Sequence, residues 1–206
     1  MKWLLVLCIA VVMTACSSRR LEKDFKVVDA SSQDIPEWVE DLDEWLDDEE
    51  KDYKKNRYYK YTTEPKNDRS TACEIAKARS ASSVASEVST FIKQSLAQSS
   101  HGDPTKENGE LSEYVQDDLT KLVQAELVGV QNYKVYWEKR RFLKEKGAKR
   151  DFDGYVCTSL VKISKANLKK AFQRSEEALA SKVDVKAKEQ VQKIMQEAAE
   201  AYTKEE

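Results

Sequence analysis

The chain has little of what most catalytic and cofactor sites are built from. It contains one histidine, His101, with five glycines and three prolines in 206 residues. A lone histidine with no cysteine beside it makes a zinc site unfavourable, and the lack of a Gly-x-Ser-x-Gly motif argues against a serine hydrolase. No glycine-rich loop is present to cradle a phosphate, and the EF-hand pattern is missing. We therefore expect no catalytic residue, no metal site and no cofactor, and we predict that the chain is not an enzyme.

Long apolar runs are also scarce, and the one that exists stands at the start of the chain. Lys2 is followed by eleven apolar residues, from Trp3 to Met13. They would make about 16 Å of helix, too short for a bilayer core of about 30 Å. A basic start, a short apolar run and small residues behind it are typical of a secretory signal. After this run we expect no further segment to span a membrane.

The signal ends in Met13-Thr14-Ala15-Cys16-Ser17, which resembles a lipobox. We expect residues 1–15 to be removed and Cys16 to carry the lipid that anchors the mature chain. An ordinary signal with Cys16 there by chance and an uncleaved anchor are the alternatives. Two or three acyl chains anchor stably, because each buried methylene contributes about 0.8 kcal/mol. An inner-membrane retention signal would carry Asp after the Cys, where this chain has Ser17. In a bacterium with two membranes the chain thus resembles an outer-membrane lipoprotein, and we expect it to face the periplasm.

Acidic and basic residues nearly balance, so nucleic acid is not expected as a partner. Removing residues 1–15 takes away one charge, that of Lys2, which leaves 34 basic and 37 acidic residues and a net charge of −3. A nucleic-acid-binding domain would be basic. The remaining 191 residues suit one domain with extensions better than two full domains.

Residues 16–33 are polar and weakly patterned, and we expect a flexible tether there. Residues 34–52 follow with eleven Asp or Glu against one Lys. Trp38, Leu42 and Trp45 have helical spacing, which predicts a short acidic helix with an aromatic stripe. The stripe either docks on the domain's own core, which we favour because exposed tryptophan is uncommon, or faces a partner through Trp38 and Trp45.

Patterns in the rest of the chain predict an α+β fold. Strand signals lie at 56–64, 130–142 and 155–163, and helical periodicity lies at 71–98, 109–127, 165–182 and 184–203. Thr71 has capping-box spacing with Glu74, and Ser164 can cap the third of these helices. We expect a small antiparallel sheet of about three strands, packed by two or more helices, over residues 34–172. We expect residues 173–206 to form a C-terminal helical extension, whose sparsely apolar stretch 184–203 projects from the domain or pairs with another chain.

Several segments carry a resemblance to a known family. They are Pro-Glu-Trp-Val at 36–39, ACEIAKARSASSVASEVSTFIKQSL at 72–96, VYWEKRRF at 135–142 and YVCTSLVKISKANLKKAF at 155–172. In this order, over residues 35–172, the chain resembles the FlgP-type (Lpp-twenty) outer-membrane lipoproteins. The resemblance implies a small α/β domain, an envelope role and, in some members, assembly of structures around the flagellar motor. It implies no catalytic residues, and the acidic segment and the long C-terminal helix exceed its pattern.

The four cysteines divide by position. Cys8 leaves with the signal and Cys16 is the predicted lipid attachment site, so Cys73 and Cys157 remain as a pair in an oxidising compartment. Cys73 lies in the first turn of a predicted helix and Cys157 lies in the middle of a predicted strand. We favour a disulfide over two buried free thiols. A reactive thiol at the helix N-terminus is a third interpretation.

A basic segment, residues 139–150, contains seven basic residues and one acid, Glu145. It is either a solvated hairpin loop or an interaction surface that includes Lys139, Arg140, Arg141, Lys149 and Arg150. The acidic segment 34–52 of a neighbouring copy is complementary in charge, which motivates a hypothesis of head-to-tail self-association.

The sequence therefore predicts a lipid-anchored envelope protein with a non-catalytic structural or assembly role. Its expected partners are the membrane, through the lipid, and either further copies of the chain or other envelope proteins. It would self-associate or scaffold a periplasmic or flagellum-associated structure. The alternative is a ligand-binding or chaperone-like periplasmic lipoprotein that uses a groove between helix and sheet.

Overall fold

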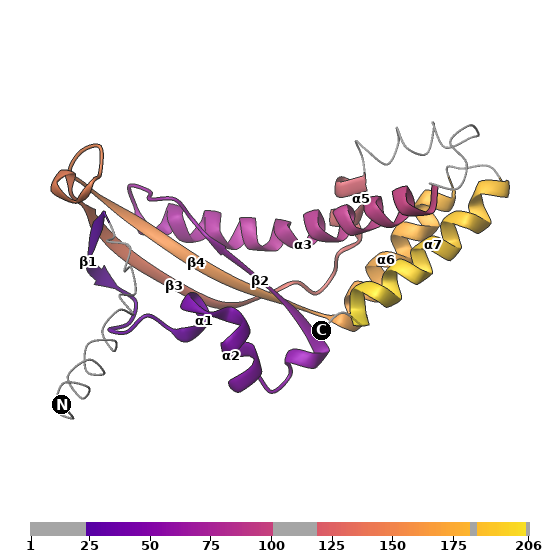
Figure 1. Cartoon of the computed structure of the whole chain (residues 1–206), viewed down its shortest axis with the longest axis horizontal. Coiled ribbons are helices and arrows are strands. Elements are labelled where there is room, and N and C mark those ends of the chain that lie inside the picture. The colour runs from indigo at the N-terminus through magenta and orange to yellow at the C-terminus, as the bar shows by residue number, and fades with distance from the viewer. Residues whose placement is uncertain (1–23, 101–118, 182–184, 205–206) are drawn as a thin grey trace, which may run out of the picture.

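The computed structural model describes residues 24–100, 119–181 and 185–204, which form an α+β fold. One antiparallel sheet has the strand order β1-β3-β4-β2. Its strands are β1 (Phe25–Ala30), β2 (Asn56–Thr62), β3 (Gln131–Phe142) and β4 (Phe152–Ser164). Figure 1 shows an elongated molecule, with the long β3–β4 hairpin reaching one end and a group of helices at the other. The fold class agrees with the prediction, but the described sheet has four strands where about three were expected.

The additional strand, β1, lies inside the predicted tether 16–33, so that prediction is wrong for residues 25–30. β1 pairs with the far end of β3, where Phe25 is opposite Phe142 and the two ring centroids are 5.5 Å apart. Aromatic pairs across neighbouring strands stabilise such a ladder. The partner strand lies more than a hundred residues later in the chain, so no local pattern reveals the pairing. The folded body therefore begins well before residue 34.

Residues 143–151 connect β3 to β4 at the end of the molecule and are called the hairpin loop below. A 3-10 turn at Lys144–Lys146 ends at Gly147, whose φ of 103° lies in the left-handed region that favours glycine. The side chain of Asp151 accepts the N–H of Lys144 at 2.6 Å and closes the loop.

Two short helices cover one face of the sheet, where the sequence predicts a single helix. They are α1 (Glu37–Glu40) and α2 (Leu42–Asp48). Asp41 separates them because its side chain accepts the N–H groups of Asp43 and Glu44, each at 3.1 Å, and so caps α2.

The aromatic stripe on these helices is docked on the sheet. Trp38 is 5% exposed and Trp45 is 3% exposed, and both pack in a cluster with Tyr136 and Leu160. The favoured interpretation, docking on the domain's own core, is confirmed. The predicted interaction surface is wrong for Trp38 and Trp45, because burial of both indole rings leaves little of either for a partner.

The opposite face of the sheet is covered by α3 (Arg69–Ser100), whose second half runs on past the strands (Figure 1). The helix is capped by Asp68, whose side chain accepts the N–H of Thr71 at 2.8 Å, so the predicted capping box at Thr71 is wrong. Ala72 and Ala76 have no exposed surface. Small residues in these turns let the helix approach the strands closely.

Three helices pack around the distal half of α3: α5 (Leu119–Glu126), α6 (Lys165–Ala180) and α7 (Val185–Lys204). Ser164 caps α6, as predicted, by accepting the N–H of Asn167 at 3.1 Å. The predicted helix at 109–127 lies mostly outside the described residues, and α5 is its described end.

The C-terminal helix α7 belongs to the main core, so the prediction of a separate, projecting extension at 173–206 is wrong. Val191, Met195 and Tyr202 are each 1% exposed and lie in the same hydrophobic cluster as Phe172. The apolar residues of α7 are few, but their helical spacing gathers them on one side of the helix. One narrow stripe is enough to pack between α6 and α3.

Candidate functional site

A disulfide connects α3 to the middle of the sheet. The sulfur atoms of Cys73 and Cys157 are 2.09 Å apart and the Cα atoms are 5.0 Å apart. Cys157 is fully buried, packed with Ala72 and Ala76. The cysteine pair is therefore a structural cross-link, and the reactive-thiol interpretation is excluded because neither sulfur is a thiolate.

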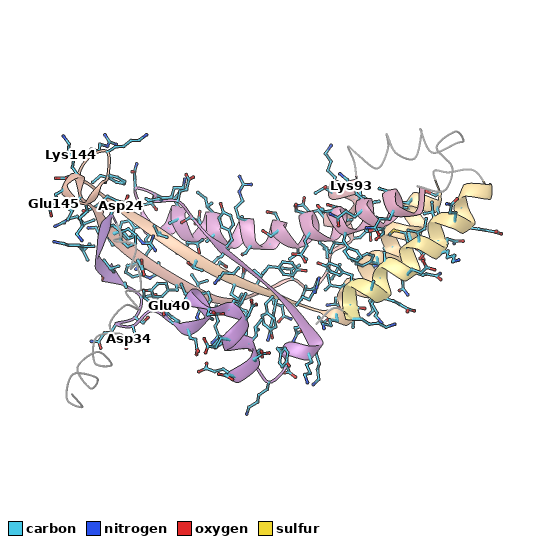
Figure 2. All side chains as sticks on the ribbon, in the orientation of Figure 1. Asp24, Asp34, Glu40, Lys93, Lys144 and Glu145 are labelled. Atoms are coloured by element: carbon cyan, nitrogen blue, oxygen red, sulfur yellow. A yellow bond between two sulfur atoms is a disulfide. The ribbon has the colours of Figure 1, made fainter. Side chains whose placement is uncertain are left out.

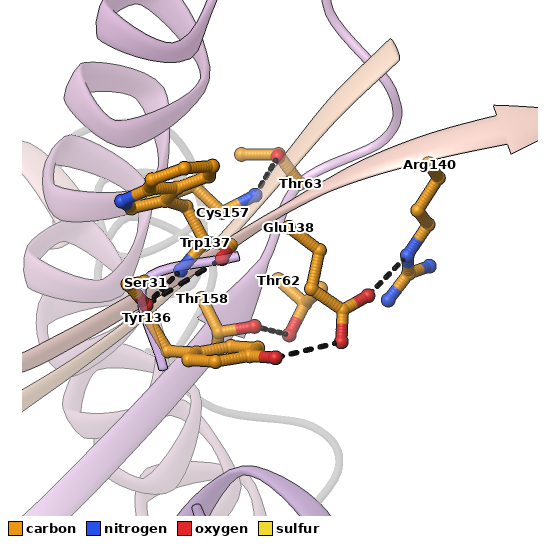
Figure 3. Close-up of polar contacts among 9 residues, drawn as sticks. All are labelled: Ser31, Thr62, Thr63, Tyr136, Trp137, Glu138, Arg140, Cys157 and Thr158. Carbon is orange, nitrogen blue, oxygen red and sulfur yellow. Dashed lines mark hydrogen bonds and ion pairs between the residues drawn. The ribbon is translucent and has the colours of Figure 1, made fainter. Parts of the chain in front are cut away.

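A buried carboxylate lies on the α1–α2 face of β3. Glu138 is 3% exposed, and Figure 3 shows it between two partners on the same strand. Arg140 Nε donates to it at 2.6 Å and the Tyr136 hydroxyl donates to it at 3.1 Å. Burial, and then the charge of Glu138, raise the pKa of Tyr136 to about 12. Nearby, Thr62 and Thr158 bond to each other at 2.9 Å.

This group is not arranged as a general acid or base. The Glu138 carboxylate is charge-paired and hydrogen-bonded by neighbours on its own strand, and its burial leaves little access for a substrate. A buried charge needs such partners, because an unpaired one would be strongly destabilising. We therefore assign Glu138 to stabilising β3 beneath the docked helices.

A second polar cluster joins β2, α3 and α7. The Tyr202 hydroxyl donates to Glu87 at 2.8 Å and bonds to the Tyr59 hydroxyl at 2.8 Å. The guanidinium of Arg57 lies 4.0 Å from the Tyr202 ring and pairs with Glu87 at 3.2 Å. Burial is the main cause that raises the pKa of Tyr59, to about 12, and it also raises the pKa of Tyr202. No sequence motif indicates this cluster, because its members come together only in the fold.

Two surface grooves lie between β2 and α3, beside the free edge of the sheet. One, of about 410 Å³, is lined by the Arg57–Glu87–Tyr202 cluster and by hydroxyls of α3 such as Ser83 and Thr90. The other, of about 440 Å³, is lined by residues that include Tyr61, Lys66, Ile75 and Arg79. Both are mixed in polarity, and they are where a ligand would find a recess between helix and sheet.

The solvent side of α1 and α2 is strongly acidic. Its exposed carboxylates form no ion pair with any residue in the described part of the chain; they are Glu37, Glu40, Asp43, Glu44, Asp47 and Asp48. Partial loss of hydration next to the protein surface, and then the charges of Glu49 and Glu44, raise the pKa of the exposed Glu37 above its ordinary value. These six carboxylates are called the acidic surface below.

The basic residues of the predicted interaction surface separate into two groups. Lys139 and Arg141 both pair with Asp153, at 3.4 and 2.8 Å, and Arg140 pairs with Glu138. Lys149 and Arg150 lie instead on the exposed hairpin loop.

Lys144 and Lys146 belong to the predicted basic segment 139–150 but were not among the residues named for its interaction surface, and both are exposed on the same loop. Figure 2 shows Lys144 and Glu145 at the end of the molecule, close to Asp24.

Other candidate residues contribute no described site. Cys16 and His101 lie outside the described residues. Within residues 24–100, 119–181 and 185–204, no group of three His, Cys, Asp or Glu side chains is placed to hold a metal ion. No helix in these ranges combines the length and the apolar character needed to cross a membrane.

Comparison with known proteins leaves the family open. The chain matches no family model, no curated protein and no solved structure. The resemblance to FlgP-type lipoproteins stays a prediction.

Proposed function

We propose that the chain is a lipid-anchored bacterial envelope protein with a non-catalytic role in assembling a structure at the membrane. The observation that carries the proposal is Cys16, which follows a basic start, a short apolar run and two small residues. The outer membrane is the proposed location, with the folded body on the periplasmic side. A disulfide between Cys73 and Cys157 suits an oxidising compartment of this kind.

The test of the anchor is incorporation of a labelled palmitate in a bacterial host. We expect the full chain to be labelled and Cys16→Ser to lose the label, because the thiol and the new amine of Cys16 are the acceptors. Cys8→Ser is the matched control, since it changes a cysteine eight positions upstream in the same segment. Label that survives in Cys16→Ser, or that depends on Cys8, would refute the anchor.

The acidic surface is the proposed contact for an assembly partner. Unpaired carboxylates on rigid helices attract a basic protein surface and set its orientation. Cross-linking of the lipidated protein in cells, followed by pull-down, should recover a partner that is lost when Asp43, Glu44, Asp47 and Asp48 are changed to their amides. Recovery of the same partner by this variant would exclude the acidic surface.

A neighbouring copy is one candidate for that partner, through head-to-tail contact between 34–52 and 139–150. Exposed charges are screened by salt, so such a complex should dissociate as salt is added. Light scattering across a salt series measures this. A monomer at both low and high salt would rule it out.

Ligand binding is the second candidate function, and the grooves between β2 and α3 favour it. The groove with Arg57 and Glu87 offers both signs of charge beside hydroxyls and the Tyr202 ring. A thermal shift with small envelope molecules would detect a ligand, because binding to the native state raises its stability. The shift should disappear in Arg57→Gln if this groove is the site.

A further inference from the structure

The start of the folded body limits how far the hairpin loop can lie from the lipid. The carbonyl of Asp24 accepts the N–H of Leu143 at 3.1 Å, so residue 24 is bonded to the loop. Eight residues lead from Cys16 to Asp24, and a chain extends by at most about 3.6 Å per residue, or roughly 29 Å in all. This step rests on the proposed anchor at Cys16. With that anchor, the loop stays within about 29 Å of the head groups, whatever path those residues take.

The hairpin loop carries an excess of positive charge. Lys144, Lys146, Lys149 and Arg150 are exposed and form no ion pair with any described residue. The acids on the loop are Glu145 and Asp151, which leaves a net charge of +2. Basic clusters beside a lipid anchor are attracted to the anionic head groups of the same leaflet.

Apolar side chains are exposed at the same end of the sheet. Phe152 is 37% exposed although it stacks on Phe142, with ring centroids 4.5 Å apart. Val27, two residues after Phe25 in β1, is 46% exposed. Side chains alternate along a strand, so Phe25 and Val27 share a face, and the pairing of Phe25 with Phe142 places that face beside Phe152.

The acidic surface of a second copy fits this end of the molecule less well than a bilayer does. The acidic surface offers negative charge, but the large apolar side chains of α1 and α2 are turned toward the sheet of their own chain. None of residues 34–52 is among the exposed large hydrophobic residues of the described chain. The boundary between head groups and acyl chains accepts cations and apolar side chains together.

We propose that the hairpin loop, with β1 beside it, docks on the anionic head groups of the leaflet that holds the lipid. Lys144, Lys146, Lys149 and Arg150 contact phosphate groups, and Phe152 and Val27 lie at the boundary with the acyl chains. The opposite end of the elongated molecule, with α6 and α7, then points away from the bilayer (Figure 1). The acidic surface stays open to a partner.

Vesicle flotation of the whole mature chain, residues 16–206 with Cys16→Ser, tests the docking without help from the lipid. We expect binding to vesicles that contain phosphatidylglycerol, weaker binding as salt is added, and little binding to phosphatidylcholine alone. An anionic surface strengthens binding by about fivefold for each cation close to it. Changing the four loop cations to Gln should therefore weaken binding on the order of a hundredfold or more.

Two variants sharpen the test. A matched control removes four exposed lysines from the opposite end of the molecule, and it should bind as the parent chain does: Lys169→Gln, Lys170→Gln, Lys188→Gln and Lys193→Gln. Val27→Thr keeps a β-branched side chain on β1 and should weaken binding a few-fold. Circular dichroism establishes that each variant is folded.

Equal binding by the loop variant and the control variant would overturn the proposal, as would equal binding of the parent chain to neutral and anionic vesicles. Loss of a solution dimer in the loop variant, with vesicle binding unchanged, would assign the loop to a second copy instead. The palmitate experiment tests Cys16 separately, so a failed anchor and a failed docking surface give different results.

Discussion

Asp68 begins α3 although Thr71 and Glu74 have the spacing of a capping box. The carboxylate of Asp68 accepts the N–H of Thr71, and this hydrogen bond lowers the pKa of Asp68 below its ordinary value of 3.8. A side chain that bonds to an otherwise unpaired N–H stabilises the helix end. Because Asp68 is the cap, the helix begins at Arg69, two residues before the start at Thr71 that the sequence pattern predicts.

The cap assignment gives a first prediction. Asp68→Ala should lower the melting temperature of the chain, while Thr71→Ala should lower it less, because that variant keeps the backbone N–H that Asp68 accepts. Thermal unfolding followed by circular dichroism compares the two. A larger decrease in melting temperature for Thr71→Ala than for Asp68→Ala would indicate that Thr71, and not Asp68, caps the helix.

Asp153 is the residue with the clearest dependence on pH. Its hydrogen bond from Arg141, and further that from Lys139, lower its pKa to about 2 from an ordinary value of 3.8. A lowered pKa in the folded state stabilises the protein above the ordinary value, and this contribution is lost as pH falls toward 2. Asp153→Asn should therefore have a lower urea midpoint than the parent chain at pH 7, with the difference shrinking as pH falls below about 4. Arg141→Gln should behave in the same way, and a difference independent of pH would contradict this assignment.

At the scale of single elements, α7 shows how a sparsely apolar helix becomes essential to a core. Met195 is 1% exposed and lies in the main hydrophobic cluster. Met195→Ala should lower the free energy of unfolding by about 2–5 kcal/mol, since it leaves a cavity. Lys193→Ala, two residues earlier and exposed, should change it by no more than about 0.5 kcal/mol. Urea denaturation measures both, and equal effects would indicate that α7 does not pack as described.

The contact between α3 and β4 depends on the disulfide as well as on packing. In a chain of residues 16–206 with Cys16→Ser, the only cysteines left are Cys73 and Cys157. Changing both to Ala should lower the free energy of unfolding by about 2–4 kcal/mol, because the bond restricts the unfolded chain.

The same disulfide prediction has a chemical control. A reducing agent should destabilise the parent chain to a similar extent and leave the double variant unchanged. Thiol titration of the unreduced, denatured parent chain should find no free thiol. Two free thiols there would contradict the cross-link.

At the scale of the whole molecule, local signals predicted most elements but few of their contacts. The strand at Tyr155–Ile163 and the cap at Ser164 are encoded by adjacent residues, and both are present in the fold. β1 was missed because its partner is distant in sequence. The Tyr59–Glu87–Tyr202 cluster was missed for the same reason, since its residues come from three separate elements.

The sequence predicted part of what the structure shows about the basic hairpin loop as a candidate surface. Seven basic residues in twelve positions marked the segment as a candidate surface, but charge alone does not distinguish paired from unpaired cations. Asp153 pairs with Lys139 and Arg141 across the strand register, and Glu138 pairs with Arg140 on its own strand, so three of the seven cations are neutralised. The structure thus narrows the candidate surface to the four cations on the loop.

The strand order also dictates when the sheet can form. Among the described strands, β1 pairs with β3 alone and β2 pairs with β4 alone, and both of these partners lie in the second half of the chain. The chain loses conformational entropy when it closes loops of this length, before the strand pairs can form their stabilising hydrogen bonds. Proteins with such topologies therefore fold slowly. When a ribosome has released only the first 130 residues, the strands that pair with β1 and β2 in the described sheet have not yet emerged. The sheet therefore forms only after the C-terminal half of the chain has been synthesised.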